Sequence, residues 1–362
     1  MNILCVIDCL GAGGAQRQIV ELAIGFKNKG HNVSFLTYHL GSFYIQILDK
    51  NGIAINCIQE SNYFKRIVKM RRFIRSGNYN AVLSFLEASN FICEISGVPY
   101  RRWKLVVGER SSNPNVYKSI KLLTYRFFHL LSDYVVSNSY SNMFMVQKIN
   151  PFLNKRKCKV IYNAIDLKKW DMIPEYIPRK NGKLKIIVPA SHQHIKNLRG
   201  LIEAVRRLSS NNKSKLTIEW YGEILDESYV DNKQRIINYG LDNIIHLLPV
   251  THNIHRIIQN ADVVGLFSFY EGMSNSICEG MACAKPIICS KVSDVPEYFD
   301  INSELLCNPE DVVTIKEAIS NLVNKSNEEL IQIGNKNRRF AECNFGKENI
   351  VDEYLKLLAN EN

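Results

Sequence analysis

Residues 269–286 read FYEGMSNSICEGMACAKP and lie between two apolar runs, 261–267 and 287–289. Each run has the length and the Val, Ile or Phe content of a buried strand. In the loop between them, Ser274 and Asn275 are small polar residues that can cap a helix, and an apolar stripe at helical spacing follows them. The stretch therefore predicts a strand, a loop, a short buried helix and a second strand.

The start of this helix is a candidate anion site. A helix that begins at the carboxyl end of a parallel strand points free N–H groups and a partial positive charge into a crevice. We therefore expect a phosphate group to be bound by the residues at the helix start, namely Gly272, Met273, Ser274 and Asn275.

Two glutamates frame this loop and helix. Glu271 precedes the helix and Glu279 lies within it. Such a spacing arises easily by chance, and two solvated charges on a surface helix are the alternative. With its flanking strands, however, the region 262–289 resembles the E-x7-E region of family 4 glycosyltransferases. The resemblance implies that Glu271 lies against the donor sugar as a catalytic residue and that Glu279 binds the ribose hydroxyls.

The chain of 362 residues exceeds the size at which one core keeps growing, so two domains are expected. The resemblance implies an α/β protein of the GT-B fold, in which two Rossmann-like domains face each other across a cleft and a C-terminal helix crosses back to the N-domain. The predicted parts are an acceptor- and membrane-facing domain (1–165), a linker (166–183), a nucleotide-sugar domain (184–344) and the returning helix (345–362).

The composition is that of an ordinary soluble protein, with 46% hydrophobic and 22% charged residues. No apolar run approaches the ~18–20 residues of a membrane span. The N-terminus has no positive leader and is typical of a first strand, so we expect the protein in the cytoplasm. The ten cysteines include no C-x-x-C pair, so we expect reduced, buried side chains, among them Cys5, Cys57, Cys278 and Cys289.

The positive charge is concentrated in the first half of the chain. Up to Ile165 there are 22 Lys and Arg against 8 Asp and Glu, a net charge of +14, whereas the remainder has 24 against 27, a net charge of −3. Such a basic half suits nucleic acid, anionic lipid or a phosphorylated substrate. No RNA- or DNA-binding motif accompanies it, so we expect no nucleic-acid partner.

Residues 63–75 hold six basic side chains and no acidic one, with apolar residues broadly at helical spacing. Such a helix can lie in a membrane interface, or it can pack its apolar face on the sheet and leave its charges in water. Further basic segments at 100–104, 117–126 and 154–159 favour the membrane. We therefore expect peripheral association with the anionic inner face of the cytoplasmic membrane.

A glycine-rich turn, residues 11–14, joins a strand at 2–8 to a helix at about 15–29. A dinucleotide site is excluded because Gln16 replaces the third glycine of G-x-G-x-x-G and no acidic residue follows the second strand. The turn resembles the first loop of family 4 enzymes, which implies that Gly13 and Gly14 approach the donor phosphates. The alternative is a purely structural tight turn.

Further strands at 53–58, 81–85, 104–108 and 134–137 alternate with helical patterns and predict a parallel sheet. After the third of these come Glu109 and Arg110, where similar enzymes bring a residue to the acceptor and the leaving phosphate. Arg110 would offset the charge of a pyrophosphate, and Glu109 would orient the acceptor hydroxyl as a catalytic group. An internal ion pair without a catalytic role is an equal alternative.

A second β-α series begins at 184–188, followed by a loop at 189–197. In relatives this loop carries glycine-arginine and then lysine, and the two cations bind the donor diphosphate. Here Ser191 stands in place of the arginine and Lys196 remains, so either His192, His194 or Arg110 substitutes or donor binding is weaker. Two later loops are expected around the nucleotide base, at Gly222 and Val250.

The sequence has no D-x-D motif and no His or Cys cluster, so we expect neither a metal nor another cofactor. The resemblance implies a retaining transfer of a hexose or N-acetylhexosamine from a nucleoside diphosphate sugar, preferably a UDP-sugar. The acceptor would be a polyprenyl-diphosphate-linked glycan of lipopolysaccharide, O-antigen or capsule assembly. Alternatives are a non-catalytic nucleotide-binding subunit of the same fold and a sugar-nucleotide epimerase or phosphorylase.

Overall fold

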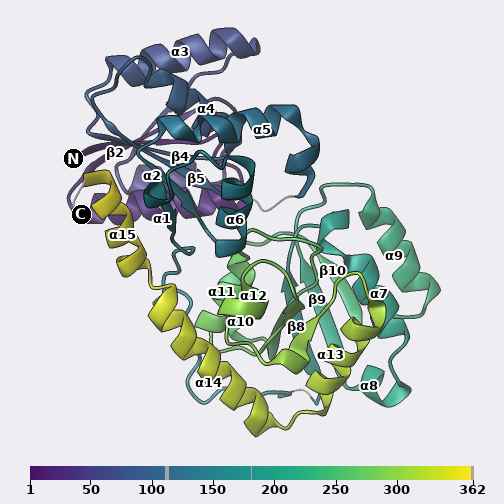
Figure 1. Cartoon of the computed structure of the whole chain (residues 1–362). Coiled ribbons are helices and arrows are strands. Elements are labelled where there is room, and N and C mark those ends of the chain that lie inside the picture. Colours follow the sequence, from purple (N-terminus) through teal and green to yellow (C-terminus); the bar gives the residue numbers. More distant parts are fainter. Residues whose placement is uncertain (111–113, 181, 360–362) are drawn as a thin grey trace. The chain divides into compact units, whose positions relative to one another are not determined.

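The structure is a computed structural model that describes residues 1–110, 114–180 and 182–359. The chain forms two compact units (Figure 1). The first comprises Met1–Ala164 together with Lys347–Asn362, and the second comprises Ile165–Gly346. The polypeptide therefore crosses between the units twice, once after Ala164 and once after Gly346.

The first unit is built on a parallel sheet with the strand order β3-β2-β1-β4-β5-β6-β7. The order reverses beside β1, and the crevice at such a switch point is where open α/β sheets bind ligands. The strands are β1 (Asn2–Val6), β2 (Asn32–Thr37), β3 (Ala54–Cys57), β4 (Ala81–Phe85), β5 (Lys104–Glu109), β6 (Tyr134–Ser137) and β7 (Cys158–Val160).

Helices flank this sheet, as parallel strands buried on both faces require (Figure 1). The helices are α1 (Gly14–Asn28), α2 (Ile45–Lys50), α3 (Tyr63–Ser76), α4 (Glu87–Ser96), α5 (Ile120–Phe127), α6 (Tyr140–Ile149) and α15 (Lys347–Ala359), with 3₁₀ turns η1 (Pro114–Lys118), η2 (Phe128–Leu131) and η3 (Lys155–Lys157). The last helix, α15, packs on α1, and a Cβ added to Gly25 would lie 2.4 Å from Val351 Cγ2. The prediction that the C-terminal helix returns to the N-domain is confirmed.

The second unit contains another parallel sheet, with the order β10-β9-β8-β11-β12-β13. Its strands are β8 (Leu184–Pro189), β9 (Leu216–Tyr221), β10 (Ile245–Leu248), β11 (Val263–Leu266), β12 (Ile287–Ser290) and β13 (Leu306–Cys307). Its helices are α7 (Leu198–Arg206), α8 (Ser210–Ser214), α9 (Ser228–Asn238), α10 (Ile254–Gln259), α11 (Asn275–Ala282), α12 (Val295–Tyr298), α13 (Val312–Asn324) and α14 (Asn327–Asn344), with 3₁₀ turns η4 (His194–Lys196) and η5 (Ser303–Leu305).

Asp262 fixes the segment at the start of the second unit to the sheet of that unit. Its carboxylate accepts hydrogen bonds from the Tyr176 hydroxyl and from the backbone N–H groups of Arg179 (3.1 Å) and Lys185 (2.7 Å). Because Asp262 is itself buried just before β11, these three bonds fix the segment before β8 to the centre of the sheet.

Several local predictions can be compared directly with the fold. The stretch that decides the fold forms β11, α11 and β12 as expected, and Ser274 is the residue that caps α11. The basic helix is α3, with Met70 and Ile74 buried. The prediction that Cys57 is buried is wrong: it is exposed because β3 is an edge strand with a partly open surface. Among the described residues, no helix is long and apolar enough to span a membrane.

Candidate active site

Two loops at the carboxyl edge of the second sheet bring Lys196 and Glu271 together. Lys196 follows β8 and Glu271 follows β11, and these strands are neighbours in the sheet. The Lys196 ammonium donates to Glu271 Oε1 across 2.6 Å. The backbone N–H of Phe269 bonds to the carbonyl of Ile195 at 2.9 Å and ties the two loops to each other. The predicted sugar-binding carboxylate and diphosphate-binding cation therefore share one site.

The Glu271 carboxylate is oriented with one oxygen engaged. Ser268 Oγ also donates to Oε1, at 2.7 Å, so both bonds converge on the same atom. Within the described part of the chain, Oε2 receives no hydrogen bond. Since the Glu271 side chain keeps 15% of its surface exposed, this oxygen is available to a hydroxyl group of a bound substrate.

The helix α11 begins beside this carboxylate. Ser274 is its N-cap but makes no side-chain bond to the helix; its hydroxyl instead pairs with Ser276 Oγ at 2.9 Å. The positive end of the helix dipole lies at this start, an arrangement that suits an anion. Gly272 is held by a hydrogen bond from Ser293 Oγ to its carbonyl, and Glu279 lies buried within the helix.

Gly222 allows a close backbone approach at the end of β9. A Cβ added to this glycine would lie 2.0 Å from the carbonyl oxygen of Ala190, so any other residue would push the loop after β8 out of place. The same carbonyl accepts a 2.7 Å bond from the Trp220 indole. Ser191 follows, and its hydroxyl accepts from Gln193 Nε2 at 2.7 Å. Val250, after β10, is an exposed residue.

The two histidines of the loop differ in environment. His192 is buried against Trp220 and Tyr229, with ring centroids 6.2 and 5.0 Å away, and burial lowers its pKa. A neutral, packed imidazole is a poor substitute for an arginine. His194 is exposed and stacks on Phe269 at 5.4 Å, which places it beside the Glu271 loop. Of the two, His194 is the better candidate for a phosphate contact.

In the first unit, the glycine turn carries Gly13 as the N-cap of α1. The Gln16 side chain folds back over Gly13, and its Nε2 donates to Asp8 Oδ1 at 2.9 Å. A Cβ added to Gly13 would lie only 2.0 Å from Gln16 Oε1. These contacts explain the glycine at position 13 by packing within the turn. An approach of Gly13 and Gly14 to donor phosphates remains a prediction.

Glu109 lies in a buried network of charges. Its side chain is 1% exposed, forms an ion pair with Arg126 in which Nη2 lies 2.7 Å from Oε2, and contacts His129 Nε2 at 3.2 Å. The other ring nitrogen of His129 lies 2.6 Å from Glu94 Oε1. This geometry favours the internal ion pair over the acceptor-orienting role, and the partners are Arg126 and His129 rather than Arg110.

The pKa shifts of this network follow from burial and from its neighbouring charges. Burial lowers the pKa of His129, but Glu94 and Glu109 outweigh it and raise that pKa to about 10. Burial raises the pKa of Glu109, but Arg126 and His129 outweigh this effect, so the pKa of Glu109 is lower than its ordinary value. At neutral pH we therefore expect a charged imidazolium between two carboxyl groups.

Arg110 is fixed by the ring of Phe85 and by α15. Its guanidinium carbon lies 3.8 Å from the Phe85 ring centroid, and its Nη2 donates to the Tyr354 hydroxyl. Asn163 accepts a weaker bond at 3.4 Å. Burial lowers the pKa of Arg110. A contact with the leaving pyrophosphate stays a prediction for this residue.

The supporting residues of both clusters were not predicted from the sequence. Ser268 lies three residues before Glu271, and its polar side chain at the end of an apolar strand is the one signal that pointed to it. Arg126 ends the basic segment 117–126, interpreted as membrane-facing, and His129 follows it; the burial of both depends on packing against α4. Among the described residues, no group of three or more His, Cys, Asp or Glu side chains forms a metal site.

Comparison with known proteins assigns the two halves of the chain. Residues 172–340 match the family "Glycosyl transferases group 1", and residues 12–169 match "Glycosyltransferase Family 4". The chain belongs to the family 4 glycosyltransferases, with the GT-B fold. It is therefore a glycosyltransferase of a family that uses nucleoside diphosphate sugars.

This chain is similar to N-acetylgalactosamine-N,N'-diacetylbacillosaminyl-diphospho-undecaprenol 4-alpha-N-acetylgalactosaminyltransferase of Campylobacter jejuni. The two are 25% identical, and the match covers 78% of this chain and 79% of the relative. This chain is 28% identical to O-antigen chain mannosyltransferase B of Escherichia coli over 33% of its length and 32% of that protein. Its fold is similar to that of Anabaena Alr3699/HepE in complex with UDP and glucose, with a TM-score of 0.87 and 17% identity over 99% of this chain and 100% of that one. TarM is similar with a TM-score of 0.81 and 11% identity, over 99% and 98% of the two chains.

Proposed function

We propose that this glycosyltransferase moves a hexose or N-acetylhexosamine from a UDP-sugar to a polyprenyl-diphosphate-linked oligosaccharide, with retention at the anomeric carbon. The observation that carries the proposal is the pairing of Glu271 with Lys196 beside the start of α11. One carboxylate, one ammonium and one helix N-terminus at the carboxyl edge of a parallel sheet suit a sugar joined to a diphosphate.

In this proposal, these groups bind different parts of the donor. The ammonium of Lys196 and the N–H groups at the start of α11 neutralise the diphosphate as negative charge grows on it. Glu271 Oε2 accepts a hydrogen bond from a hydroxyl of the sugar, and Glu279 accepts hydrogen bonds from the ribose hydroxyls. The bond from the anomeric carbon to the phosphate oxygen breaks, the acceptor oxygen bonds to that carbon on the same face, and the acceptor's proton passes to the departing phosphate. The free nucleoside diphosphate then leaves.

The choice of donor and acceptor draws on the relatives. The Campylobacter relative is named for transfer to an undecaprenol-diphosphate glycan, and the Anabaena structure holds UDP with glucose. A polyprenyl diphosphate acceptor also fits the large excess of positive charge in the first half of the chain, because it is an anion in a membrane. We therefore propose a role in O-antigen or capsule-type assembly, at the inner face of the cytoplasmic membrane.

The experiment that tests the proposal is a donor screen. Purified protein is incubated with each common UDP-, GDP- and ADP-sugar, with and without membrane extract, and release of free nucleotide is measured. We expect one UDP-sugar to be turned over faster than the others, and proton NMR of the product to show the donor's anomeric configuration. An inverted linkage would contradict retention alone, whereas no turnover and no nucleotide binding would contradict the enzyme.

A second candidate function rests on Ser191. By the resemblance, Ser191 stands where relatives carry the arginine that binds the donor diphosphate together with the lysine. The loss of this cation favours a non-catalytic nucleotide-binding subunit of the same fold. A test restores the cation with Ser191→Arg. If UDP binding and donor turnover both rise in the variant, the wild-type site is a weakened enzyme; if binding rises without any turnover, the subunit is the better description.

Exposed apolar side chains on the first unit support the membrane part of the proposal. On α3, Phe64 is 76% exposed, and on α5, Ile120 is 83% exposed. The two helices are joined by a 2.7 Å hydrogen bond between the hydroxyls of Tyr63 and Tyr125, and Lys121 lies 5.7 Å from both rings. We propose that this surface places Phe64 and Ile120 in the acyl boundary with lysines at the headgroups.

Replacing Phe64 and Ile120 together by serine is expected to reduce membrane binding at least about tenfold. Complete burial of a large apolar side chain contributes roughly 1.5–3 kcal/mol, so partial insertion of the two exceeds the ~1.4 kcal/mol that corresponds to tenfold. Flotation with vesicles containing anionic lipid, at ~0.15 M salt, measures the bound fraction. The matched control replaces Val230 and Ile237, exposed residues of α9 in the second unit, by serine. Equal binding of both double variants would contradict the assignment of this surface.

A further inference from the structure

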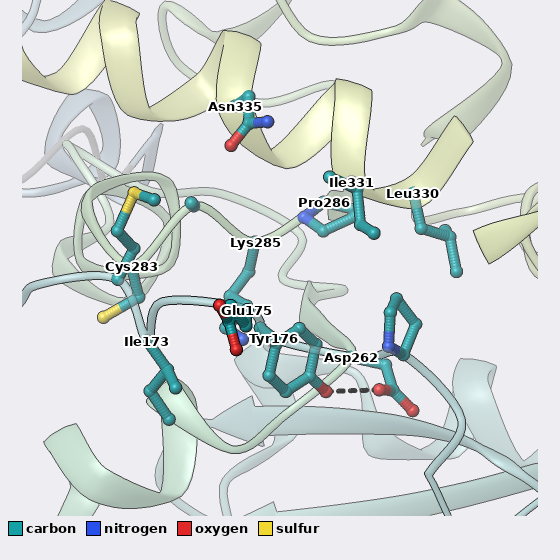
Figure 2. A pocket seen from close by; sticks show the side chains of 13 residues that line it. Ile173, Glu175, Tyr176, Asp262, Cys283, Lys285, Pro286, Leu330, Ile331 and Asn335 are labelled. Carbon is teal, nitrogen blue, oxygen red and sulfur yellow. Dashed lines mark hydrogen bonds between the residues drawn. The ribbon is translucent and has the colours of Figure 1, made fainter. Parts of the chain in front are cut away.

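A pocket lies in the second unit, away from the pair of Lys196 and Glu271. It has a volume of about 250 Å³ and is lined by Tyr176, Asp262, Lys285 and the α14 residues Leu330 and Asn335, among others (Figure 2). Asp262 precedes β11 and Lys285 precedes β12, so the pocket is at the amino-terminal edge of the sheet. The candidate active site occupies the opposite, carboxyl edge.

The unusual group in this pocket is the ammonium of Lys285. The residue is 1% exposed, and its Nζ lies 3.3 Å from the centroid of the Tyr176 ring. Figure 2 shows the two side chains close together within the ring of labelled residues. Across the ranges that the structure describes, Lys285 makes no hydrogen bond and no ion pair through its side chain. Burial lowers its pKa to about 8.

The nearby carboxylates form no ion pair with this cation, although the charge of Asp262 raises its pKa against the effect of burial. Asp262 is already bonded to the Tyr176 hydroxyl and to two backbone N–H groups, and no ion pair joins it to Lys285. Glu175 also lines the pocket but is an exposed residue, so water screens its charge. A buried cation without a hydrogen-bonding partner destabilises the fold, so Lys285 is better explained by a ligand than by stability.

We propose that this pocket binds a small organic acid whose carboxylate pairs with Lys285. The single ammonium suits a monoanion, whereas a phosphate dianion would call for further cations. The acid needs an apolar body, because the rest of the wall is mainly apolar and includes Pro286, Leu330 and Ile331. The volume is near the lower end of the ~300–1,000 Å³ of ligand sites, which limits the body to a short chain or a single ring.

The position of the pocket suggests what such a ligand does. Tyr176 belongs to the segment that follows the first crossing between units, and Leu330 and Asn335 belong to α14, which leads to the second crossing. A bound acid therefore ties together the two segments through which the chain enters and leaves this unit. The binding itself does not depend on the proposed transfer reaction.

The test compares acids with their neutral amides. Hexanoate and benzoate, beside hexanamide and benzamide, are titrated into wild-type protein and binding is followed by ligand-observed NMR. We expect both acids to bind at least about tenfold more tightly than the amides, since one charged hydrogen bond is worth about 1.5–3 kcal/mol. Lys285→Met should lose this preference. The control Lys336→Met, which replaces an exposed lysine of α14, a helix that lines the pocket, should keep it.

Two further measurements separate the ligand from a structural role of Lys285. Affinity for the acids should fall as pH rises through about 8, because the amine must be protonated to pair with a carboxylate. Glu175→Gln should tighten binding a few-fold by removing the one exposed carboxylate at the pocket. UDP binding, measured in every variant, reports an intact donor site. Equal affinity for acids and amides, or a preference retained in Lys285→Met, would overturn the proposal whether or not the protein turns over a sugar nucleotide.

Discussion

A protein in which Glu271 is replaced by glutamine is expected to turn over its sugar nucleotide at least about 100-fold more slowly than wild type, with UDP binding changed by less than about threefold. Glutamine keeps the size of the side chain and can still accept from Ser268. It loses the negative charge that pairs with Lys196 at 2.6 Å and that would stabilise positive charge on the sugar as its bond to the diphosphate breaks. The loss should therefore fall on kcat.

The measurement is nucleotide release under saturating donor, together with calorimetric titration of UDP. Glu317→Gln is the matched control, because Glu317 is an exposed residue of α13 in the same unit. Its turnover should equal that of wild type. If Glu271→Gln keeps wild-type kcat and weakens UDP binding instead, then Glu271 holds the nucleotide and is not the residue that faces the reacting sugar.

The donor half of the site could be predicted because its signals are local. The periods of the apolar residues located β11, α11 and β12, and a small polar residue marked the start of α11 at Ser274. The resemblance to family 4 enzymes assigned both Lys196 and Glu271 to the donor. The structure brings them together, although 75 residues separate them, because the neighbouring parallel strands that they follow end at one edge of the sheet.

The surroundings of the expected acceptor residues were less predictable because their contacts depend on packing between distant helices. Glu109 follows a strand end, as a site residue would, but α4 and the α5–η2 segment bury it with Arg126 and His129. Helix α3 shows a similar limit, since its sequence left membrane binding and packing on the sheet equally open. The structure buries Met70 and Ile74 and exposes Phe64, so one helix has room for both roles.

Replacement of His129 by leucine is expected to lower the free energy of unfolding by about 3–5 kcal/mol, because removing one partner of a buried charge pair leaves the other uncompensated. Glu94 loses the contact at 2.6 Å, and Glu109 loses the one at 3.2 Å. Both carboxyl groups stay buried after the substitution. A double variant that also carries Glu94→Leu should recover more than half of the loss, since it removes the stranded carboxyl group and fills the site with apolar atoms.

The pH dependence of unfolding distinguishes this charge network from simple packing. The pKa of His129 is raised to about 10 in the folded protein, against about 6.5 in an unfolded chain, so the folded state binds the extra proton between these values. Its contribution is therefore complete below about pH 6.5 and is lost as pH rises through 10. Urea unfolding at pH 6 and pH 9 should show a wide gap between wild type and His129→Leu at the lower pH and a narrower gap at the higher one. Lys29→Met, which breaks a half-exposed pair with Asp352, is the surface control and should cost less than about 1 kcal/mol. A gap that is the same at both pH values would mean that His129 is neutral and that the loss reflects packing alone.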